Sequence, residues 1–183
     1  MVGRYYRPLT VMHEVKAARK MKPMVAIFVS VAIPAAAAGL DTYTNARYGY
    51  SISYPRGLLK PLPEADNGDG RIFKSKTGTA QFRVFSNGFD DPKEIANLAE
   101  EGCPNRKASY RVVKPALVAV SCETTKGNIL YSKTLVQDGM ATTMTADYPK
   151  SESHIWEPVV SAMSKTMTAA HEPERSAAVT AHH

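Results

Sequence analysis

The acidic turn Glu64–Gly70 holds the residues whose types come nearest to a metal-binding motif. An EF-hand loop needs oxygen ligands at positions 1, 3 and 5, glycine at 6 and an acid at 12. Counted from Asp66, positions 3 and 5 are glycines and position 12 is Thr77, so the pattern fails. A glycine-rich turn explains the stretch better, and we predict neither a metal nor a cofactor. If this loop binds a cation or a partner, the expected residues are Glu64, Asp66 and Asp69.

The two cysteines could form a disulfide or do thiol chemistry. In an exported chain two thiols usually pair, and a bond between Cys103 and Cys122 would close a loop of about 20 residues, worth roughly 3 kcal/mol in the chain-entropy model. A redox or nucleophilic cysteine is the alternative. However, the chain has no Cys-x-x-Cys spacing, and of its histidines only His154 lies in the part expected to fold, where a nucleophile would need a base. We therefore predict a structural disulfide.

Basic side chains are concentrated between the two cysteines. Such a cluster could bind an acidic partner or a glycan. The alternative interpretation is a solvated loop and strand face, which is the commoner situation for surface charges. The candidate partner-binding residues are Arg106, Lys107, Arg111 and Lys114.

Aromatic residues offer two further candidates. Tyr48, Tyr50 and Tyr54 share one face of an alternating segment, and such a row is either a ligand-stacking platform or, more often, the core face of a strand. Trp156 close to His154 could mark a pocket, although a core or rim tryptophan is the expected role.

The chain lacks the hydrolase nucleophile elbow, the phosphate loop, the dinucleotide fingerprint and the zinc-protease motif. We assign no catalytic residue and expect a protein that is not an enzyme.

The first 38 residues have the three parts of a secretory signal peptide. A basic stretch, Lys16–Lys22, precedes the apolar run Met24–Ile33, and small residues follow up to Ala38, the preferred cleavage site. A transmembrane anchor is the alternative, but an apolar stretch of about 17 residues interrupted by Pro34 is marginal for spanning ~30 Å of hydrocarbon. We predict a periplasmic or secreted protein without a stable membrane span after cleavage; Met1 and Met21 are both possible starts.

The charge balance changes once the leader is set aside. The 183-residue chain has 23 basic and 17 acidic side chains and a pI near 9.3. Residues 1–38 contain six of the basic groups and one acidic group, so residues 39–183 carry 17 and 16, a net charge of +1. Because the excess positive charge lies in the leader, we expect no nucleic-acid partner.

The elements needed to position these residues follow from residue periodicity. Alternation predicts strands in the segments 47–54, 71–74, 79–86, 109–114, 117–123, 129–137 and 140–148. A capped helix is expected over 91–101 and a short one over 159–165. Hairpin turns are indicated at 126–128 and 138–139. The result is one α+β domain over 39–168, with an antiparallel sheet of six or seven strands and two helices, followed by a disordered tail over 169–183.

The segment Tyr-Gly-Tyr-Ser-Ile-Ser-Tyr-Pro at 48–55 resembles the opening strand of the PsbP-like fold. That superfamily includes an extrinsic photosystem II subunit, the nuclear import factor Mog and small bacterial envelope proteins. The resemblance continues through the turn at 67–70, the strand after Gly78, the capped helix and the closing segment 148–167. It implies an antiparallel sheet packed between helices and a role in partner binding or assembly. It carries over no site residue, because the shared motifs are structural.

Three functions are compatible with these observations. The leading hypothesis is a non-enzymatic periplasmic protein that binds an envelope protein or cell-wall component, with the loops 62–70 and 104–108 as expected contacts because they carry irregular charged residues. The second is an inhibitor or immunity-type protein against a cell-wall enzyme. The third is a small exported hydrolase whose paired carboxylates converge only in space.

Overall fold

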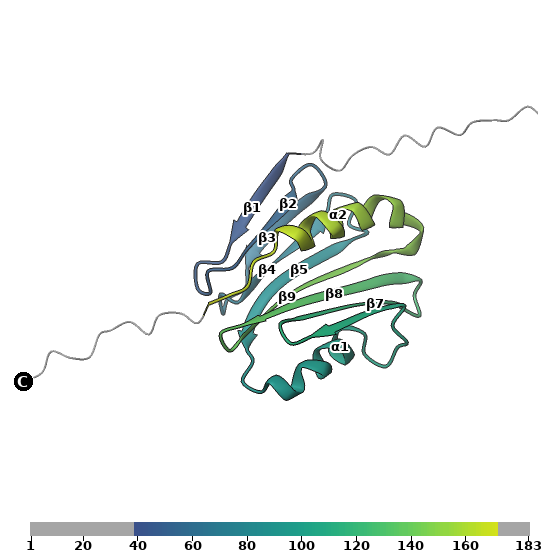
Figure 1. Cartoon of the computed structure of the whole chain (residues 1–183). Helices are drawn as coiled ribbons and strands as arrows, with labels where there is room; N and C mark the ends of the chain where they lie inside the picture. The colour runs from purple at the N-terminus through teal and green to yellow at the C-terminus, as the bar shows by residue number, and fades with distance from the viewer. Residues whose placement is uncertain (1–38, 172–183) are drawn as a thin grey trace, which may run out of the picture. The chain divides into compact units, whose positions relative to one another are not determined.

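The computed structural model describes residues 39–171. Its main element is a seven-stranded sheet in the order β3-β4-β5-β9-β8-β7-β6, in which all neighbours are antiparallel. Figure 1 shows these strands side by side. The predicted signal peptide, 1–38, and most of the predicted tail, 172–183, lie outside the described residues. The strands are β3 Leu59–Glu64, β4 Gly70–Ser75, β5 Gln81–Gly88, β6 Tyr110–Lys114, β7 Leu117–Glu123, β8 Asn128–Gln137 and β9 Met140–Pro149.

Tight turns connect the long central strands. Asp138 and Gly139 have φ values of 50° and 71°, the left-handed backbone that a two-residue hairpin turn requires and that Asp-Gly supplies at low cost. This turn sets the register of β8 against β9, in which Thr134 lies opposite Thr143. The hairpin predicted at 138–139 is thereby confirmed.

One face of the sheet is covered by helix α2 (Ser153–Thr166) together with a separate hairpin of β1 (Leu40–Thr44) and β2 (Ser51–Pro55). The strands turn alternate apolar side chains toward this cover, as in β5, where Phe82 and Val84 are fully buried and Arg83 between them is exposed. The segment after α2, yellow in Figure 1, runs along β2, and the backbone N–H of Thr168 donates to the carbonyl of Ser51 at 2.9 Å. The hairpin is therefore held by the segment after α2 and also by direct side-chain contacts with the sheet, such as Tyr54 against Phe73 of β4.

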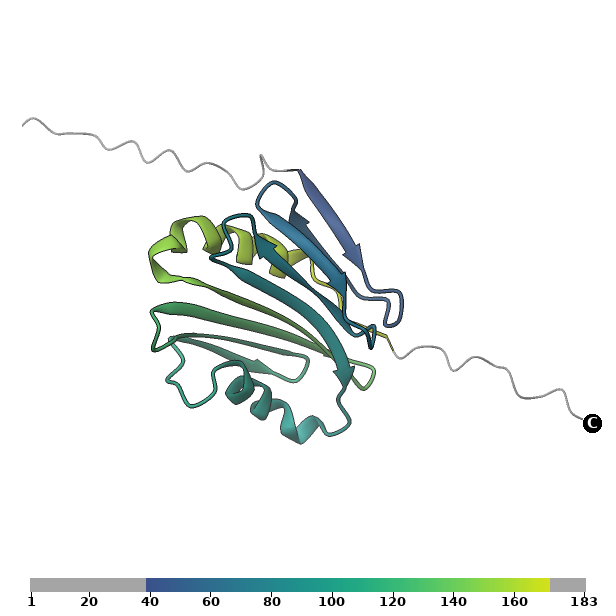
Figure 2. The ribbon, with the colours of Figure 1, turned by 180° about the vertical axis from the view of Figure 1, so that it is seen from behind.

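The opposite face is covered by a 3₁₀ turn, η2 (Pro92–Ala96), and helix α1 (Asn97–Gly102). Figure 2 shows the same arrangement from behind. A second, smaller core forms here from residues of α1, β7 and the two cysteines. Cys103 and Cys122 form a disulfide, with Cα atoms 6.0 Å apart, as predicted. The bond ties the end of α1 to β7, the strand next to the β6 edge of the sheet.

The predicted fold class is confirmed, but several elements differ from expectation. The segment 47–54 was expected to join the main sheet, whereas β2 pairs only with β1. Strand β3 was not predicted, because Pro61 and Pro63 argue against a strand; both are tolerated since β3 lies at the sheet edge. The first turn of the predicted helix 91–101 is 3₁₀, and none of its residues is buried, so no packing selects α geometry there.

The last helix starts earlier than the sequence indicates. It was expected from Val159, but α2 begins at Ser153 and contains Pro158. The additional helical residues before Pro158 include Trp156, which packs against Phe82 with ring centroids 5.8 Å apart. This burial compensates for the backbone hydrogen bond that Pro158 cannot donate. The ordered chain also continues past 168: Ala170 is buried, and its N–H donates to Thr142 Oγ1 at 2.8 Å.

Candidate functional site

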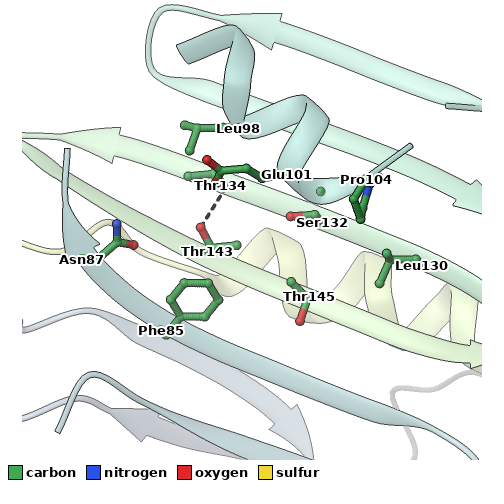
Figure 3. Close-up of a pocket in the computed structure, with 11 residues that line it drawn as sticks. Phe85, Asn87, Leu98, Glu101, Pro104, Leu130, Ser132, Thr134, Thr143 and Thr145 are labelled. Carbon is green, nitrogen blue, oxygen red and sulfur yellow. Dashed lines mark hydrogen bonds between the residues drawn. The ribbon is translucent and has the colours of Figure 1, made fainter. Parts of the chain in front are cut away.

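A cleft opens on the α1 side of the sheet, where the short helix leaves part of β5, β9 and β8 uncovered. Figure 3 shows this α1 cleft between the helix and the three strands. Its volume is about 250 Å³. The lining residues are Phe85, Asn87, Leu98, Glu101, Gly102, Pro104, Leu130, Ser132, Thr134, Thr143 and Thr145.

The floor of the α1 cleft is a block of four hydroxyl side chains. On adjacent strands Thr134 lies opposite Thr143, and Ser132 lies opposite Thr145. Ser132, Thr134 and Thr143 are only 5%, 2% and 8% exposed. The hydroxyls of Thr134 and Thr143 are 2.9 Å apart, and this is the one hydrogen bond drawn among the lining residues in Figure 3. The Ser132 and Thr145 hydroxyls are therefore free of partners within the lining.

The rim combines an aromatic ring with two polar side chains. Phe85 lies opposite Thr143 in the sheet, and the guanidinium of Arg83 stacks over its ring at 4.3 Å, which holds the ring in place. Asn87 and Glu101 are exposed on the rim. Glu101 is the only titratable group in the lining.

The roof of the cleft depends on a close approach of α1 to the sheet. A Cβ atom on Gly102 would lie 2.5 Å from Val120 Cγ2 and 2.9 Å from Ser132 Cβ. Such distances are sterically forbidden, so only glycine allows the helix end to reach the floor. The neighbouring disulfide then holds this end at the sheet. At the other end, Asp91 accepts a hydrogen bond from the N–H of Lys93 at 2.8 Å and caps η2.

This arrangement suits polar recognition. Each hydroxyl can donate one hydrogen bond and accept others, so the floor can match carbonyls, amides or hydroxyls of a bound group. Leu98 and Leu130 add apolar walls. The combination of a mainly neutral floor with few directed polar groups is typical of a binding pocket.

The predicted acidic loop serves mainly as structure. Glu64 accepts hydrogen bonds from the hydroxyl of Tyr43 and from Asn45 Nδ2, the latter at 2.9 Å. Burial, and next the hydrogen bond to Glu64, raise the pKa of Tyr43. Asp69 accepts from Asn67 Nδ2 at 2.8 Å, whereas Asp66 is exposed. Within residues 39–171 no group of three or more histidine, cysteine or acidic side chains is placed to hold a metal ion.

The four residues of the predicted basic cluster do not share a surface. Arg111 and Lys114 are three positions apart in β6 and so point to opposite faces of the sheet. Arg111 is 3.5 Å from Glu100 of α1. Arg106 donates to the carbonyl of Pro104 at 3.0 Å, and Lys107 is exposed in the loop.

The two loops expected to make contacts lie far apart in the strand order. The loop 62–70 joins β3 to β4 at one edge, and the loop 104–108 leads into β6 at the other edge. A single compact partner site cannot include both. In contrast, Tyr50, Tyr54 and Trp156 are buried in the core, as expected, and Tyr48 is partly buried against it.

Sequence reasoning did not single out the hydroxyls of the α1 cleft. A signal was present, because Ser132 and Thr134 alternate along β8 and Thr143 and Thr145 alternate along β9. Periodicity assigns such residues to one face of each strand. It does not show that these faces adjoin or that a helix leaves them uncovered.

No helix within residues 39–171 has the length and hydrophobicity needed to cross a membrane. No protein-family model matches the chain, and no curated protein matches it significantly.

The solved structures similar to the chain include three that each cover 72% of its length. One is CyanoP, the PsbP of Synechocystis, at 11% identity and TM-score 0.44 over 93% of that protein. Another is LpqN of Mycobacterium tuberculosis, described as involved in cell envelope biogenesis, at 13% identity and 0.45 over 91%. The third, from Bacteroides thetaiotaomicron, has 14% identity and 0.43 over 48%. A PsbP is thus among the structures that resemble this fold, as the sequence resemblance implied, and we draw no function from these likenesses.

Proposed function

We propose that the chain is an exported, non-enzymatic accessory protein that binds another envelope protein or component, and that the α1 cleft is its principal contact. The observation behind this proposal is the block of four hydroxyls, three of them on buried residues, that borders a cavity of about 250 Å³. Buried polar side chains are usually satisfied internally. Hydroxyls of Ser132 and Thr145 that face a cavity instead are available to a bound group.

The cleft is preorganised on both sides. Its floor belongs to the central strands β8 and β9, and its roof is held by the disulfide and by the contact of Gly102 with the sheet. A rigid site loses little conformational entropy on binding, so more of the contact energy appears as affinity. This rigidity supports a role in recognition.

The acidic groups are distributed in a way that favours binding over hydrolysis by paired carboxylates. Three cavities on residues 39–171 contain one carboxylate each: Glu101, Glu157 and Asp69. A glycosidase-type mechanism needs two carboxyl groups about 5–10 Å apart across one site.

Export is supported by the disulfide, because such bonds persist in oxidising compartments. It is also supported by the leader pattern of residues 1–38.

The proposal can be tested by site-specific photo-cross-linking in the native envelope. A photoreactive residue replaces Asn87 on the rim of the cleft, and a control carries it at Lys126, an exposed hairpin residue elsewhere. We expect a discrete adduct from position 87 that is absent from position 126. The captured component is then purified and titrated against the wild-type protein and Thr145→Val, which keeps the shape of the floor but removes one of the two unpaired hydroxyls. Equal labelling at both positions, or unchanged affinity of Thr145→Val, would contradict the proposal.

A further inference from the structure

A second groove lies on the other face of the sheet, between α2 and strands β6, β7, β8 and β9. It has a volume of about 390 Å³, within the range of about 300–1,000 Å³ typical of small-molecule sites. Seven of its ten lining residues carry a hydroxyl, and three of the seven are tyrosines. We call it the tyrosine groove. It is separate from the α1 cleft, which opens on the opposite face.

Two tyrosine rings form the walls of the groove. Ser121 of β7 lies opposite Tyr110 of β6 on one side and opposite Tyr131 of β8 on the other. The small serine between two large rings leaves a depression whose sides are aromatic. Tyr110 is 52% exposed, one of the large apolar side chains that the fold leaves in solvent. An exposed aromatic ring beside a polar groove is characteristic of a binding site.

The third tyrosine and a carboxylate supply polar groups at the α2 side. Tyr148 of β9 and Glu157 of α2 both line the groove. Burial first, and the negative charge of Glu157 second, raise the pKa of Tyr148 to about 12. Burial also raises the pKa of Tyr131. Both phenols therefore stay protonated at physiological pH and can donate and accept hydrogen bonds.

The charge of the lining selects among ligands. Glu157 is the one charged side chain of the lining. The nearby ammonium of Lys133 does not belong to the lining and donates to the carbonyl of Ser164. A groove with a carboxylate and no cation disfavours phosphate, carboxylate and sulfate groups. Neutral hydroxyl groups, in contrast, match it in both hydrogen-bonding directions.

We propose that the tyrosine groove binds a segment of a neutral glycan chain. The apolar face of a sugar ring stacks on Tyr110 and Tyr131, while sugar hydroxyls bond to Glu157 and the serine hydroxyls of the rim. This inference goes beyond the proposed function, because it concerns another surface and requires no protein partner.

The test is an NMR titration of the purified protein with three neutral tetrasaccharides: chitotetraose, cellotetraose and maltotetraose. We expect saturable binding of at least one of them, with the largest amide shift changes at Ser109, Tyr110 and Ser121 of the groove wall and at Glu157 and Ser161 of α2. Tyr110→Ala should weaken this binding about tenfold, and Tyr110→Phe, which keeps the ring, by less than about threefold.

Two further variants separate specific from general effects. Glu157→Gln should weaken binding several-fold through loss of the charged acceptor. Ile155→Ala removes an exposed apolar side chain of α2 that does not line the groove, and should leave affinity unchanged. The inference is overturned if none of the three saccharides binds, if Tyr110→Ala binds as well as the wild type, or if anionic tetragalacturonate binds more tightly than the neutral chains.

Discussion

Gly102 at the end of α1 lies so close to β7 that a Cβ atom would approach Val120 Cγ2 to 2.5 Å. Gly102→Ala should therefore lower the free energy of unfolding by about 1–3 kcal/mol, as overpacking does in well-packed interiors. Chemical denaturation measures this change. Gly88→Ala is the matched control, because a Cβ there meets nothing within 4 Å. Similar stabilities for the two variants would show that α1 can move away from the sheet at little cost.

Loss of the disulfide should weaken the same helix–sheet contact. Cys103→Ser should reduce the free energy of unfolding by roughly 3 kcal/mol in the chain-entropy model, because the bond closes a 19-residue separation. The wild type unfolded in the presence of a reductant should match the variant. If Cys103→Ser and oxidised wild type have equal stability, the disulfide does not stabilise the fold.

Asn45 is a fully buried polar residue in the turn between β1 and β2. Its side chain donates to Glu64 and to the carbonyl of Gly68, and accepts from the N–H of Tyr48. Asn45→Ala removes these hydrogen bonds and should cost about 3 kcal/mol of unfolding free energy. Asn87→Ala, at an exposed position, should change stability by less than about 0.5 kcal/mol. A comparable loss in both variants would refute the structural role of the Asn45 network.

Stability should fall in alkaline solution. Burial raises the pKa of Tyr148 from 10.0 to about 12, so between these values the unfolded state releases a proton that the folded state keeps. The stabilisation is complete below pH 10 and is lost as the pH rises through about 12. From pH 10 to 11 this tyrosine alone should reduce the unfolding free energy by about 1 kcal/mol. Denaturation curves for the wild type and Tyr148→Phe test this; a pH slope that is the same in both would contradict it.

Patterns local in sequence predicted most of the elements. Alternation located six of the seven strands of the main sheet, and Asp138-Gly139 located the turn between β8 and β9. The exception, β3, contains two prolines whose tolerance depends on lying at an edge. Whether a strand lies at the edge depends on the order of strands in the sheet, and a local sequence pattern does not predict that order.

Local sequence patterns predicted the candidate sites less well than the secondary-structure elements. Glu64, named as a residue that a cation or partner of the loop would contact, instead accepts hydrogen bonds from Tyr43 and Asn45 of a hairpin 19 or more residues earlier. Arg111 and Lys114, close in sequence, point to opposite faces. Charge clusters read from sequence thus include residues that the sheet separates, because neighbouring positions in a strand alternate in direction.

By itself, the sequence determined the α+β class, the disulfide pairing and which side chains share a face of each strand, since periodicity, turn residues and a single pair of cysteines are local or unambiguous signals. Only the tertiary structure decided which strands are neighbours, and with them the hydroxyl block of Ser132 and Thr145 and the facing rings of Tyr110 and Tyr131. The physical reason is that strand order and helix cover are set by burial of the whole chain's apolar surface. Both grooves are regions that this cover leaves open.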